Sequence, residues 1–321
     1  MKILLTRPLH DFATRELRKR YEVEVYRGRV PMPKKLLISR IAEKEGLICY
    51  PYDRIDADII AAGRKLRAIS TFSVGYDHID TGAAAKRGIT VSYTPEVLTG
   101  ATADLTMALL LSLFRRVGEG DSLIRRGKWR SILGPSEFLG CDISGKTLGI
   151  LGMGRIGMEV ARRAIAFDMK VLYHSRRRIP SSKERSLGAR HVTLEQLFRL
   201  SDVVSIHAPH TPETDEIVDL NLLKKMKRTA FLVNTARGRI VSEKDLAFAL
   251  KKGIISGAAL DVFRSEPIGP PNPLTKLSNV VITPHIGSAT VETRKAMAEV
   301  AVKNLMLSLS GRRPVYQVRA G

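Results

Sequence analysis

Residues 147–157 read TLGILGMGRIG, a mostly apolar run that passes directly into a glycine-rich turn. The run predicts a buried strand, and the residues after the turn predict a helix. A GxGxxG motif between a strand and a helix is typical of dinucleotide binding. In that setting Gly152 permits the tight turn, Gly154 lets the backbone approach a pyrophosphate, and Gly157 lets the helix pack against the strand.

The start of the predicted helix adds phosphate-binding groups. Arg155 and Ile156 stand in its first turn, where backbone amides have no partner within the helix and the helix dipole is positive. We therefore expect both residues to belong to a cofactor site. The alternative interpretation is a glycine-rich turn with a purely structural role.

The next strand distinguishes between the two nicotinamide cofactors. Residues 170–178 read KVLYHSRRR, and the first acidic residue after them is Glu184. An NAD enzyme carries an acidic residue near this position for the ribose hydroxyls, whereas arginines bind the 2′-phosphate of NADP. We predict that Ser175, Arg176 and Arg177 bind this phosphate, so that NADP(H) is preferred and NAD stays possible. The alternative is that the arginines only form a solvated surface.

The length of 321 residues indicates two domains. Short strands alternate with helices, which predicts an α/β protein with two doubly wound parallel sheets. Residues 99–285 are predicted to form a Rossmann NAD(P)-binding domain, inserted in a flavodoxin-like substrate domain of residues 1–98 plus 286–321. A long amphipathic helix predicted at 291–309 returns to the first domain, because six strands already complete a dinucleotide-binding sheet.

The predicted strands are short apolar runs. In the first domain they lie at residues 1–8, 23–26, 46–51 and 67–72. In the second domain they lie at residues 147–154, 170–175, 203–209, 230–236, 257–262 and 280–285. A helix is predicted at 101–114, between the two sets of strands.

Three polar segments follow the last three predicted strands, at the sheet edge where open α/β folds bind their ligands. They read NTARG at 234–238, LDVFRSEP at 260–267 and PHIGSAT at 284–290. Because the carboxyl ends of parallel strands meet at one edge, the three segments are expected to converge.

These segments contain the groups that reduction of a keto acid requires. The forked guanidinium of Arg237 can bind a carboxylate. His285 changes protonation near neutral pH and is the natural acid for the carbonyl oxygen. Glu266 can orient the imidazole and favour its protonated form. We therefore predict Arg237, Glu266 and His285 as the catalytic residues, with hydride supplied by a nicotinamide.

The ordered motifs GMGRIG, NTARG, SEP and PHIGSAT, with TFSVGYDHID and YTPEVLTGATADL upstream, resemble the D-2-hydroxyacid dehydrogenase family. Within it the sequence is most similar to glyoxylate and hydroxypyruvate reductases, over essentially the whole chain. The resemblance implies an oxidoreductase that acts on a small 2-keto acid, and a homodimer in which the helix around Leu105 packs. It also implies that the backbone amides of Val74 and Gly75, together with Arg237, bind the substrate.

The family also implies further residues on the nicotinamide side of the cofactor site. Together with neighbouring residues that we also predict to bind the cofactor, they are Thr102, Pro209, Thr214, Thr235, Ala236, Asp261, His285 and Gly287.

Some positions depart from the family pattern or attract a second interpretation. His210 stands where many relatives carry an apolar residue, and we expect it to pack rather than to catalyse. His207 and His78 are likewise expected to be structural, and Trp129 is expected to be a packing residue. Residues 131–140 lack a tryptophan that some hydroxypyruvate reductases place at the substrate pocket, so the choice of 2-keto acid stays open.

The chain is strongly basic, with a formal net charge of +21. A basic surface can bind nucleic acid or steer anionic substrates and cofactors. Because the basic residues are dispersed and no aromatic-rich motif accompanies them, we favour steering or a solvated surface and expect no nucleic-acid partner.

The cysteines and the apolar stretches indicate a cytoplasmic protein. Cys49 and Cys141 match no metal or redox spacing, so we expect two buried free thiols and no metal site. The N-terminus shows no signal peptide, and the apolar stretch 105–114 is too short to span a bilayer, so no membrane partner is expected.

Two alternatives to a glyoxylate or hydroxypyruvate reductase stay open. Another 2-hydroxyacid dehydrogenase or a phosphite dehydrogenase of the same family would share the Arg–Glu–His set. Formate dehydrogenases are disfavoured because they carry glutamine at the position of Glu266. A non-enzymatic, dinucleotide-sensing protein resembling a corepressor is the other alternative, because fold does not determine function.

Overall fold

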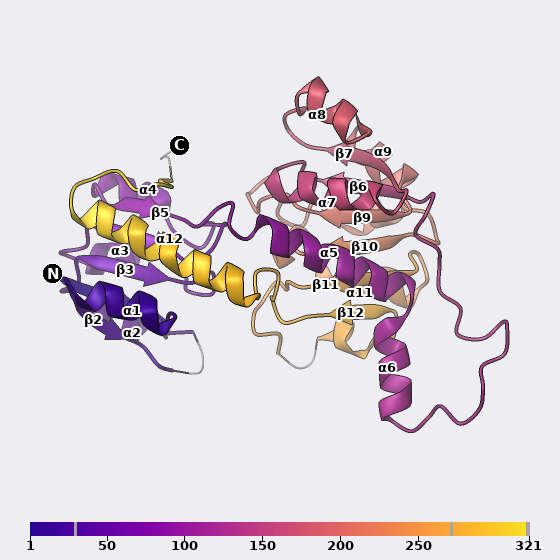
Figure 1. The fold of residues 1–321 in the computed structure, drawn as a ribbon, viewed down its shortest axis with the longest axis horizontal. Helices are drawn as coiled ribbons and strands as arrows, with labels where there is room; N and C mark the ends of the chain where they lie inside the picture. Colours follow the sequence, from indigo (N-terminus) through magenta and orange to yellow (C-terminus); the bar gives the residue numbers. More distant parts are fainter. Residues whose placement is uncertain (29–30, 270–271, 319–321) are drawn as a thin grey trace. The chain divides into compact units, whose positions relative to one another are not determined.

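The computed structural model describes residues 1–28, 31–269 and 272–318. The chain forms two compact units (Figure 1). Unit 1 comprises Met1–Leu98 and Ser288–Gly321, and unit 2 comprises Thr99–Gly287. Each unit contains one parallel sheet with connecting helices, which confirms the predicted α/β class.

Unit 1 contains a five-stranded sheet in the order β2-β1-β3-β4-β5. Its strands are β1 (Lys2–Leu5), β2 (Glu22–Val25), β3 (Gly46–Cys49), β4 (Ala68–Thr71) and β5 (Thr90–Ser92). Its helices are α1 (Asp11–Arg18), α2 (Lys34–Ile41), α3 (Ala57–Ala62), α4 (Thr81–Lys86) and α12 (Val291–Leu309). The order changes direction between β1 and β3, as in the predicted flavodoxin-like sheet.

The last helix of unit 1 explains why the end of the chain belongs with its beginning. Every fourth residue of α12 is buried, which makes one apolar stripe along the helix. This stripe packs against β3, β4 and β5. The buried Asn304 donates a hydrogen bond to the carbonyl of Tyr93 at 3.1 Å and accepts one from the amide of Val315 at 3.0 Å, so the helix also fixes the segment that follows it.

Unit 2 contains a seven-stranded sheet in the order β12-β11-β10-β9-β6-β7-β8. Its strands are β6 (Thr147–Leu151), β7 (Lys170–His174), β8 (Ala189–His191), β9 (Val203–Ile206), β10 (Phe231–Asn234), β11 (Gly257–Leu260) and β12 (Val280–Ile282). Its α-helices are α5 (Thr99–Phe114), α6 (Val117–Arg125), α7 (Arg155–Ile165), α8 (Ser181–Ser186), α9 (Leu194–Leu200), α10 (Leu220–Leu223) and α11 (Glu243–Lys251). Short 3-10 helices lie at Gly238–Ile240 and Pro273–Lys276.

The order of unit 2 corrects one detail of the sequence prediction. In a Rossmann sheet the strand order is 3-2-1-4-5-6, and β8 is the third strand of that order. The sequence analysis missed β8 and counted β12 as the sixth strand, whereas β12 is a seventh strand at the opposite edge. The strand order reverses between β6 and β9, because β7 and β8 lie on one side of β6 and β9 to β12 lie on the other. This class of sheet binds its ligand at that point.

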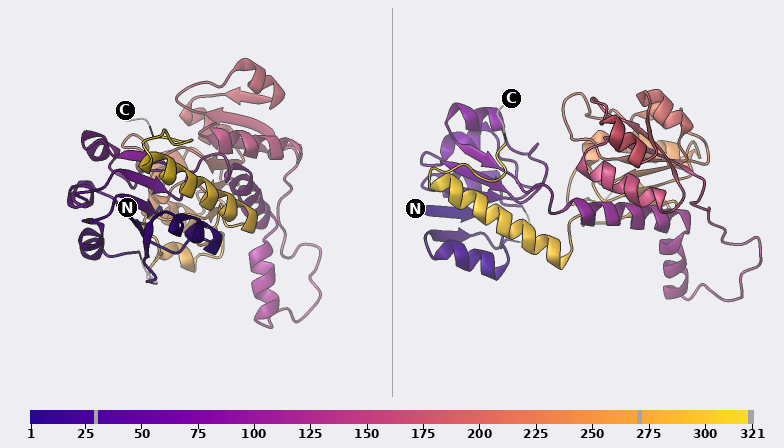
Figure 2. Two further views of the ribbon diagram at one scale, coloured as in Figure 1. Left: turned by 60° about the vertical axis from the view of Figure 1, so that its left-hand side comes forward. Right: turned by 45° about the horizontal axis from the view of Figure 1, so that its top comes forward.

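One part of unit 2 extends from its sheet. Helix α6 and residues 126–143 extend away from the other elements of unit 2 in all three views (Figures 1 and 2). Helix α6 buries none of its residues. Trp129 was expected to be a packing residue, but it is 55% exposed, and Ile132 in the same segment is 91% exposed. Cys141 in this segment is also exposed, contrary to expectation, whereas Cys49 is buried.

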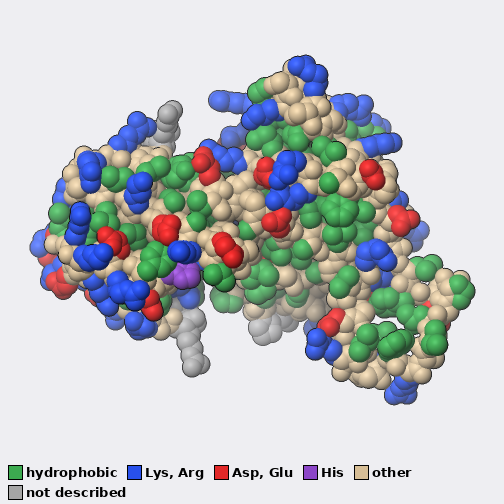
Figure 3. Space-filling model, viewed as in Figure 1, with side chains coloured by type: hydrophobic (Ala, Val, Ile, Leu, Met, Phe, Trp, Pro, Cys, Tyr) green, Lys and Arg blue, Asp and Glu red, His purple; other side chains and the backbone are tan. Residues whose placement is uncertain are grey.

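Basic side chains are dispersed over the surface, as expected from their distribution in the sequence. Lysine and arginine side chains are spread over the face shown in Figure 3 and do not form one patch. None of the described helices combines the length and the apolar character that a membrane span requires.

Candidate active site

The glycine-rich turn follows β6 and begins α7, and each glycine is constrained differently. Gly152 has φ of +98°, and a Cβ there would lie 2.5 Å from the amide nitrogen of Ala208. A Cβ at Gly157 would lie 2.4 Å from the carbonyl oxygen of Gly152. A Cβ at Gly154 would meet nothing within 4 Å. The first and third glycines are therefore required by the fold, and the second leaves its backbone open to approach by a ligand.

Backbone hydrogen bonds place this turn at the point where the strand order reverses. The amide of Gly152 donates to the carbonyl of His174 at 2.8 Å, and the amide of His207 donates to the carbonyl of Leu151 at 2.7 Å. The turn thus lies between the ends of β7 and β9. Its shape and the start of α7 fit the pyrophosphate of a dinucleotide.

The three arginines after β7 differ in their contacts with other side chains. Arg176 and Arg177 are exposed, and Ser175 donates a hydrogen bond to the carbonyl of Arg177 at 2.6 Å. Arg178 instead forms two hydrogen bonds of 2.8 Å with the carboxylate of Glu184. The 2′-phosphate prediction therefore concerns Ser175, Arg176 and Arg177, as the sequence analysis named them.

The segment after β9 carries two more predicted cofactor residues. The hydroxyl of Thr214 donates to the carbonyl of Pro209 at 2.8 Å, so these residues form one turn. His207 bonds Ser205 at 2.8 Å, and burial lowers the pKa of the His207 imidazole to about 3. A neutral, hydrogen-bonded imidazole is consistent with the structural role expected for His207.

Thr235 and Ala236 follow β10 and are fixed by side chains from other elements. Thr235 forms a 2.9 Å hydroxyl–hydroxyl hydrogen bond with Thr106 in α5, and the Thr106 hydroxyl also bonds the carbonyl of Thr102 at 2.8 Å. The amide of Ala236 donates to the side chain of Asn234 at 3.0 Å. Two predicted cofactor residues, Thr102 and Thr235, thus share one network that joins α5 to the end of β10, and Ala236 is fixed separately by Asn234.

Asp261 follows β11 and fixes the loop after β12. Its buried carboxylate accepts hydrogen bonds from the Thr283 hydroxyl at 2.6 Å and from the amides of Ile286 and Gly287, both at 2.8 Å. Burial raises the pKa of this carboxyl group. The contacts determine the path of the loop that carries His285.

His285 and Glu266 form the central pair of the site. The Nδ1 atom of His285 lies 2.5 Å from Oε2 of Glu266, and Oε1 of Glu266 accepts the amide of Phe263 at 2.8 Å. His285 has φ of +55°, a left-handed conformation that is uncommon for residues other than glycine and costs on the order of 1 kcal/mol. Both side chains are largely buried.

Gly238 brings the segment of Arg237 against the segment of Glu266. A Cβ at Gly238 would lie 1.9 Å from the carbonyl carbon of Phe263, so the two backbones touch. The carbonyl of Arg237 accepts a hydrogen bond from Asn234 at 2.9 Å, and its guanidinium donates to the carbonyl of Ala236 at 2.8 Å. Because β10, β11 and β12 are adjacent strands, the three predicted catalytic residues follow neighbouring strand ends.

A second histidine of unit 2 also pairs with a carboxylate. Nε2 of His210 lies 2.9 Å from Asp215, and Arg239 binds the same carboxylate at 3.0 and 3.1 Å. These contacts with Arg239 and His210 lower the pKa of Asp215. The cluster is a local ion-pair network, in agreement with the structural role expected for His210.

The predicted substrate amides lie in unit 1, in the loop after β4. The hydroxyl of Ser73 donates to the carbonyl of Gly75 at 2.5 Å, and Thr71 bonds both Ser73 at 2.9 Å and His78 at 3.0 Å. No hydrogen bond to protein is recorded for the amides of Val74 and Gly75 within the described part of the chain. A fixed loop with two adjacent amides that donate no hydrogen bond within the described residues suits an anion.

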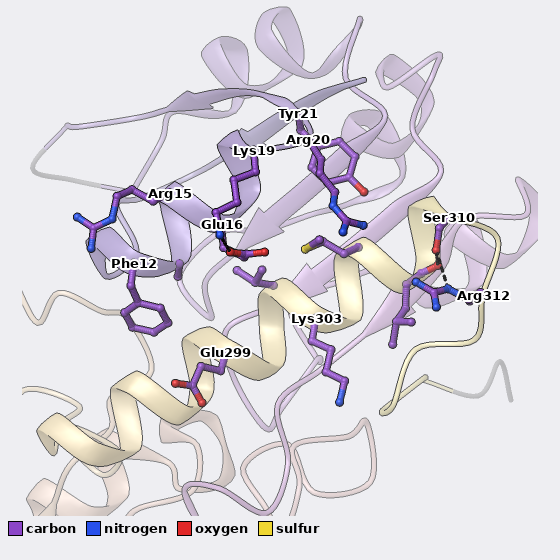
Figure 4. Close-up of a pocket in the computed structure, with 14 residues that line it drawn as sticks. Phe12, Arg15, Glu16, Lys19, Arg20, Tyr21, Glu299, Lys303, Ser310 and Arg312 are labelled. Carbon is purple, nitrogen blue, oxygen red and sulfur yellow. Dashed lines mark hydrogen bonds and ion pairs between the residues drawn. The ribbon is translucent and has the colours of Figure 1, made fainter.

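Unit 1 also contains a cavity of about 750 Å³ between α1 and α12, which is lined by basic and apolar side chains (Figure 4). Lys19 and Glu16 at its rim form an ion pair of 2.6 Å. The lining includes Tyr21 and Arg312, which follow the C-terminal ends of the two helices. None of the predicted site residues lines it.

Comparison with known proteins agrees with this arrangement. Residues 107–287 match the family model of the D-isomer specific 2-hydroxyacid dehydrogenase, NAD binding domain. The chain is 45% identical to the glyoxylate reductase of Korarchaeum cryptofilum over 313 residues, which cover 98% of this chain and 94% of that protein. The crystal structure of the TT0316 protein of Thermus thermophilus matches with a TM-score of 0.92 and 49% identity, over 99% of this chain and 100% of that one.

A third relative has been solved with ligands. The NADPH-dependent glyoxylate/hydroxypyruvate reductase of Sinorhizobium meliloti, in complex with NADP and malonate, matches with a TM-score of 0.87 and 31% identity. The match covers 99% of this chain and 96% of that one.

The protein is thus an oxidoreductase with a Rossmann domain of the type that binds NAD. More particularly, the chain belongs to the D-isomer specific 2-hydroxyacid dehydrogenase family. The family predicted from its motifs is confirmed.

Sequence reasoning missed several residues that shape the site. Thr106 and Thr283 are ordinary helix and strand-end threonines in the sequence, and Glu184 was noted only as a distant acid. A signal existed only for Glu184, because its position six residues after Arg178 allows contact across a short turn. Thr106 bonds a residue 129 positions away, which no local pattern indicates.

Proposed function

We propose that this 2-hydroxyacid dehydrogenase reduces glyoxylate or hydroxypyruvate, with D specificity where the product is chiral, and prefers NADPH. The observation that carries the proposal is the 2.5 Å pair of His285 and Glu266, in backbone contact with the segment of Arg237 through Gly238. Relatives named glyoxylate reductase, at 45% identity and nearly full length, support the substrate class.

Arg237 binds the carboxylate of the keto acid in this proposal. A guanidinium offers parallel N–H donors that match the two oxygens of a carboxylate. Its segment is fixed by Asn234 and by the close approach of Gly238 to Phe263. This fixed backbone orients the substrate relative to the acid.

His285 donates the proton to the carbonyl oxygen. Because Nδ1 is bonded to Glu266, Nε2 is the atom that delivers the proton. The carboxylate of Glu266 stabilises the imidazolium and is itself positioned by the amide of Phe263. Such general acid catalysis typically contributes about 10²–10⁴-fold to the rate.

The cofactor would be held by the turn of Gly152, Gly154 and Gly157 and by the first turn of α7. When bound, the nicotinamide supplies the hydride. The nicotinamide side of the site is proposed to be formed by Thr102, Thr235, Ala236, Asp261 and Gly287. Pro209 and Thr214, in the segment after β9, are proposed to belong to the same cofactor site. The hydrogen-bond network of Thr106 and the loop contacts of Asp261 keep these residues in place.

The preference for NADPH rests on the residues after β7. Arg176 and Arg177 are exposed there, and the first acidic residue that follows them along the chain, Glu184, is bonded to Arg178. Guanidinium groups bind a phosphate with charge-assisted hydrogen bonds, whereas a carboxylate would repel it. The relative from Sinorhizobium meliloti is named as NADPH-dependent, which supports the same assignment here.

In unit 1 we propose that the amides of Val74 and Gly75 also bind the substrate. The Ser73 hydroxyl fixes this loop by its bond to the carbonyl of Gly75.

We further propose a homodimer in which α5 and the elements that follow it pack. Exposed apolar residues in α6 and in residues 126–143, such as Ile132, favour an interface there. Light scattering of the purified protein tests this, and a monomer at micromolar concentration would contradict it.

A panel of 2-keto acids, each assayed with NADPH and NADH by the absorbance of the reduced nicotinamide, tests the function. We expect the highest kcat/KM for glyoxylate or hydroxypyruvate with NADPH. A higher kcat/KM with NADH would contradict the cofactor assignment, and a clear preference for a larger keto acid would contradict the substrate assignment.

A further inference from the structure

The turn after β7 is closed by a small group of polar side chains. Tyr173, the fourth residue of β7, is fully buried, and its hydroxyl donates to Oε1 of Glu184 at 2.5 Å. The same hydroxyl accepts the amide of Ile179 at 3.1 Å. One phenol therefore joins the strand, the end of the turn and helix α8.

Arg178 completes the group on its outer side. Its Nε and Nη2 atoms donate to the two oxygens of Glu184, both at 2.8 Å, in the forked geometry that guanidinium and carboxylate groups share. Glu184 is 8% exposed, whereas the side chain of Arg178 is 64% exposed. The contacts with Arg178 and Tyr173 lower the pKa of Glu184 to about 2, so the carboxylate is ionised at neutral pH.

This arrangement has two consequences for residues 175–177. The turn is tied at its far end by Ile179 and Arg178 and internally by the hydrogen bond from Ser175 to the carbonyl of Arg177, so its backbone path is fixed. In addition, the negative charge of Glu184 is paired with the guanidinium of Arg178 and bonded to the hydroxyl of Tyr173. A carboxylate near this turn would otherwise repel a phosphate or bind ribose hydroxyls.

We propose that Tyr173, Arg178 and Glu184 are positioning residues that determine cofactor selectivity: they hold the turn so that Ser175, Arg176 and Arg177 receive the 2′-phosphate of NADP. None of the three contacts the cofactor in this proposal. The inference rests on the proposed NADP preference and adds the mechanism by which a fold with a nearby acid achieves it.

The test measures binding of two fragments, adenosine 2′,5′-bisphosphate and AMP, to the full-length protein by calorimetry. The ratio of their dissociation constants isolates the contribution of the 2′-phosphate. Tyr173→Phe is the central variant, because it removes the hydroxyl without changing charge or the buried ring. Arg178→Gln removes the cation, and Arg178→Lys keeps the charge but cannot form the forked contact.

Arg185→Gln is the matched control. Arg185 is exposed in helix α8, next to Glu184, and carries the same charge as Arg178. We expect the wild type to favour the bisphosphate, and Tyr173→Phe and Arg178→Gln to reduce that preference about three- to tenfold, the effect of losing one or two hydrogen bonds. Arg178→Lys should lie between these variants and the wild type, and the control should change the ratio less than twofold.

Each other outcome has a distinct meaning. Equal binding of the two fragments by the wild type would contradict the NADP preference itself. A normal wild-type ratio that falls in Arg178→Gln but not in Tyr173→Phe would mean that Arg178 contacts the phosphate directly, which overturns the positioning role. Lower melting temperatures with unchanged ratios would show a structural role only. If Tyr173→Phe does not fold, Arg178→Lys against the control decides the question, because both substitutions are at the surface.

Discussion

Two histidine–carboxylate pairs in unit 2 have similar distances and different surroundings. His285 lies 2.5 Å from Glu266, and His210 lies 2.9 Å from Asp215. Glu266 uses its second oxygen for the amide of Phe263, whereas Asp215 is shared with the guanidinium of Arg239. The first carboxylate can therefore stabilise an imidazolium, and the second is already neutralised by an arginine.

The backbone adds a second difference between the pairs. His285 has a positive φ and lies in a loop whose neighbouring amides are bonded to the buried Asp261. His210 lies in a turn that is closed by its own threonines. A strained residue that its surroundings hold in place is a marker of a functional site, whereas a histidine in a self-contained turn is not. A histidine–carboxylate contact alone therefore does not identify a catalytic pair.

The largest expected effect is on His285. His285→Ala should lower kcat by about 10²–10⁴-fold, because the proton donor is lost while the glycine-rich turn is untouched. Steady-state kinetics measures the loss, and calorimetry with NADP measures cofactor affinity, which should stay within a few-fold of the wild type. Near-normal turnover would remove His285 as the acid.

Glu266→Gln should have an intermediate effect. The amide keeps the size of the side chain but cannot stabilise a charged imidazole, so we expect kcat to fall about 10- to 100-fold. Steady-state kinetics measures this loss. A fall in stability with unchanged kcat would instead show that the pair is structural, like that of His210.

Asp261→Ala tests the loop that distinguishes the two histidines. Removing the carboxylate leaves the Thr283 hydroxyl and two buried amides without their acceptor, so the free energy of unfolding should fall by roughly 2–4 kcal/mol. Chemical denaturation measures this change. We also expect kcat to fall, because His285 is no longer fixed; a destabilised variant with full activity would contradict that link.

His210→Gln should have little effect. The histidine belongs to a cluster with Asp215 and Arg239, whose side chains are 34% and 50% exposed, and contacts to such partly exposed charges contribute about 1 kcal/mol or less to stability. We expect kcat/KM to stay within about twofold of the wild type in the same assay. A loss comparable to that of Glu266→Gln would make His210 part of the catalytic site.

The smallest effect is a dependence on pH. Because Arg239 and His210 lower the pKa of Asp215 in the folded chain below its usual value of 3.8, the carboxylate stabilises the fold above that value and ceases to do so as the pH falls through the lowered pKa. The wild type should therefore melt slightly above Asp215→Asn at pH 7, and this difference should shrink as the pH is lowered below the usual value of 3.8. A difference that persists in acid would contradict the ion-pair account.

The parts of the fold that follow from the sequence are those with strong local patterns. The apolar runs of β6, β9 and β10 and the glycine-rich turn indicated both the sheet and its ligand-binding edge. Strands β5 and β8 were missed because they read TVS and ARH and lack an apolar run, whereas β12, which also has three residues, reads VVI and was predicted. Such short strands form by backbone pairing with a neighbour already in place, which no window of sequence reveals.

The same distinction applies to the candidate site. Residue types and order predicted Arg237, Glu266 and His285, and the structure brings the last two into contact. The contacts that fix them, such as Asp261 with the amides of the loop after β12, depend on strand adjacency. Cys141 was expected to be a buried thiol and Trp129 a packing residue, but both lie in a segment that leaves the sheet and are exposed.

The contact of Gly238 with Phe263 has a consequence for redesigning the enzyme. Since the main chains of the two segments touch at Gly238, the close approach of the segment of Arg237 to that of Glu266 depends on the absence of a methyl group there. New cations or acids can therefore be exchanged at those two positions while the spacing is preserved. A single alanine at 238 would instead push the two strand ends apart and misalign any combination placed there.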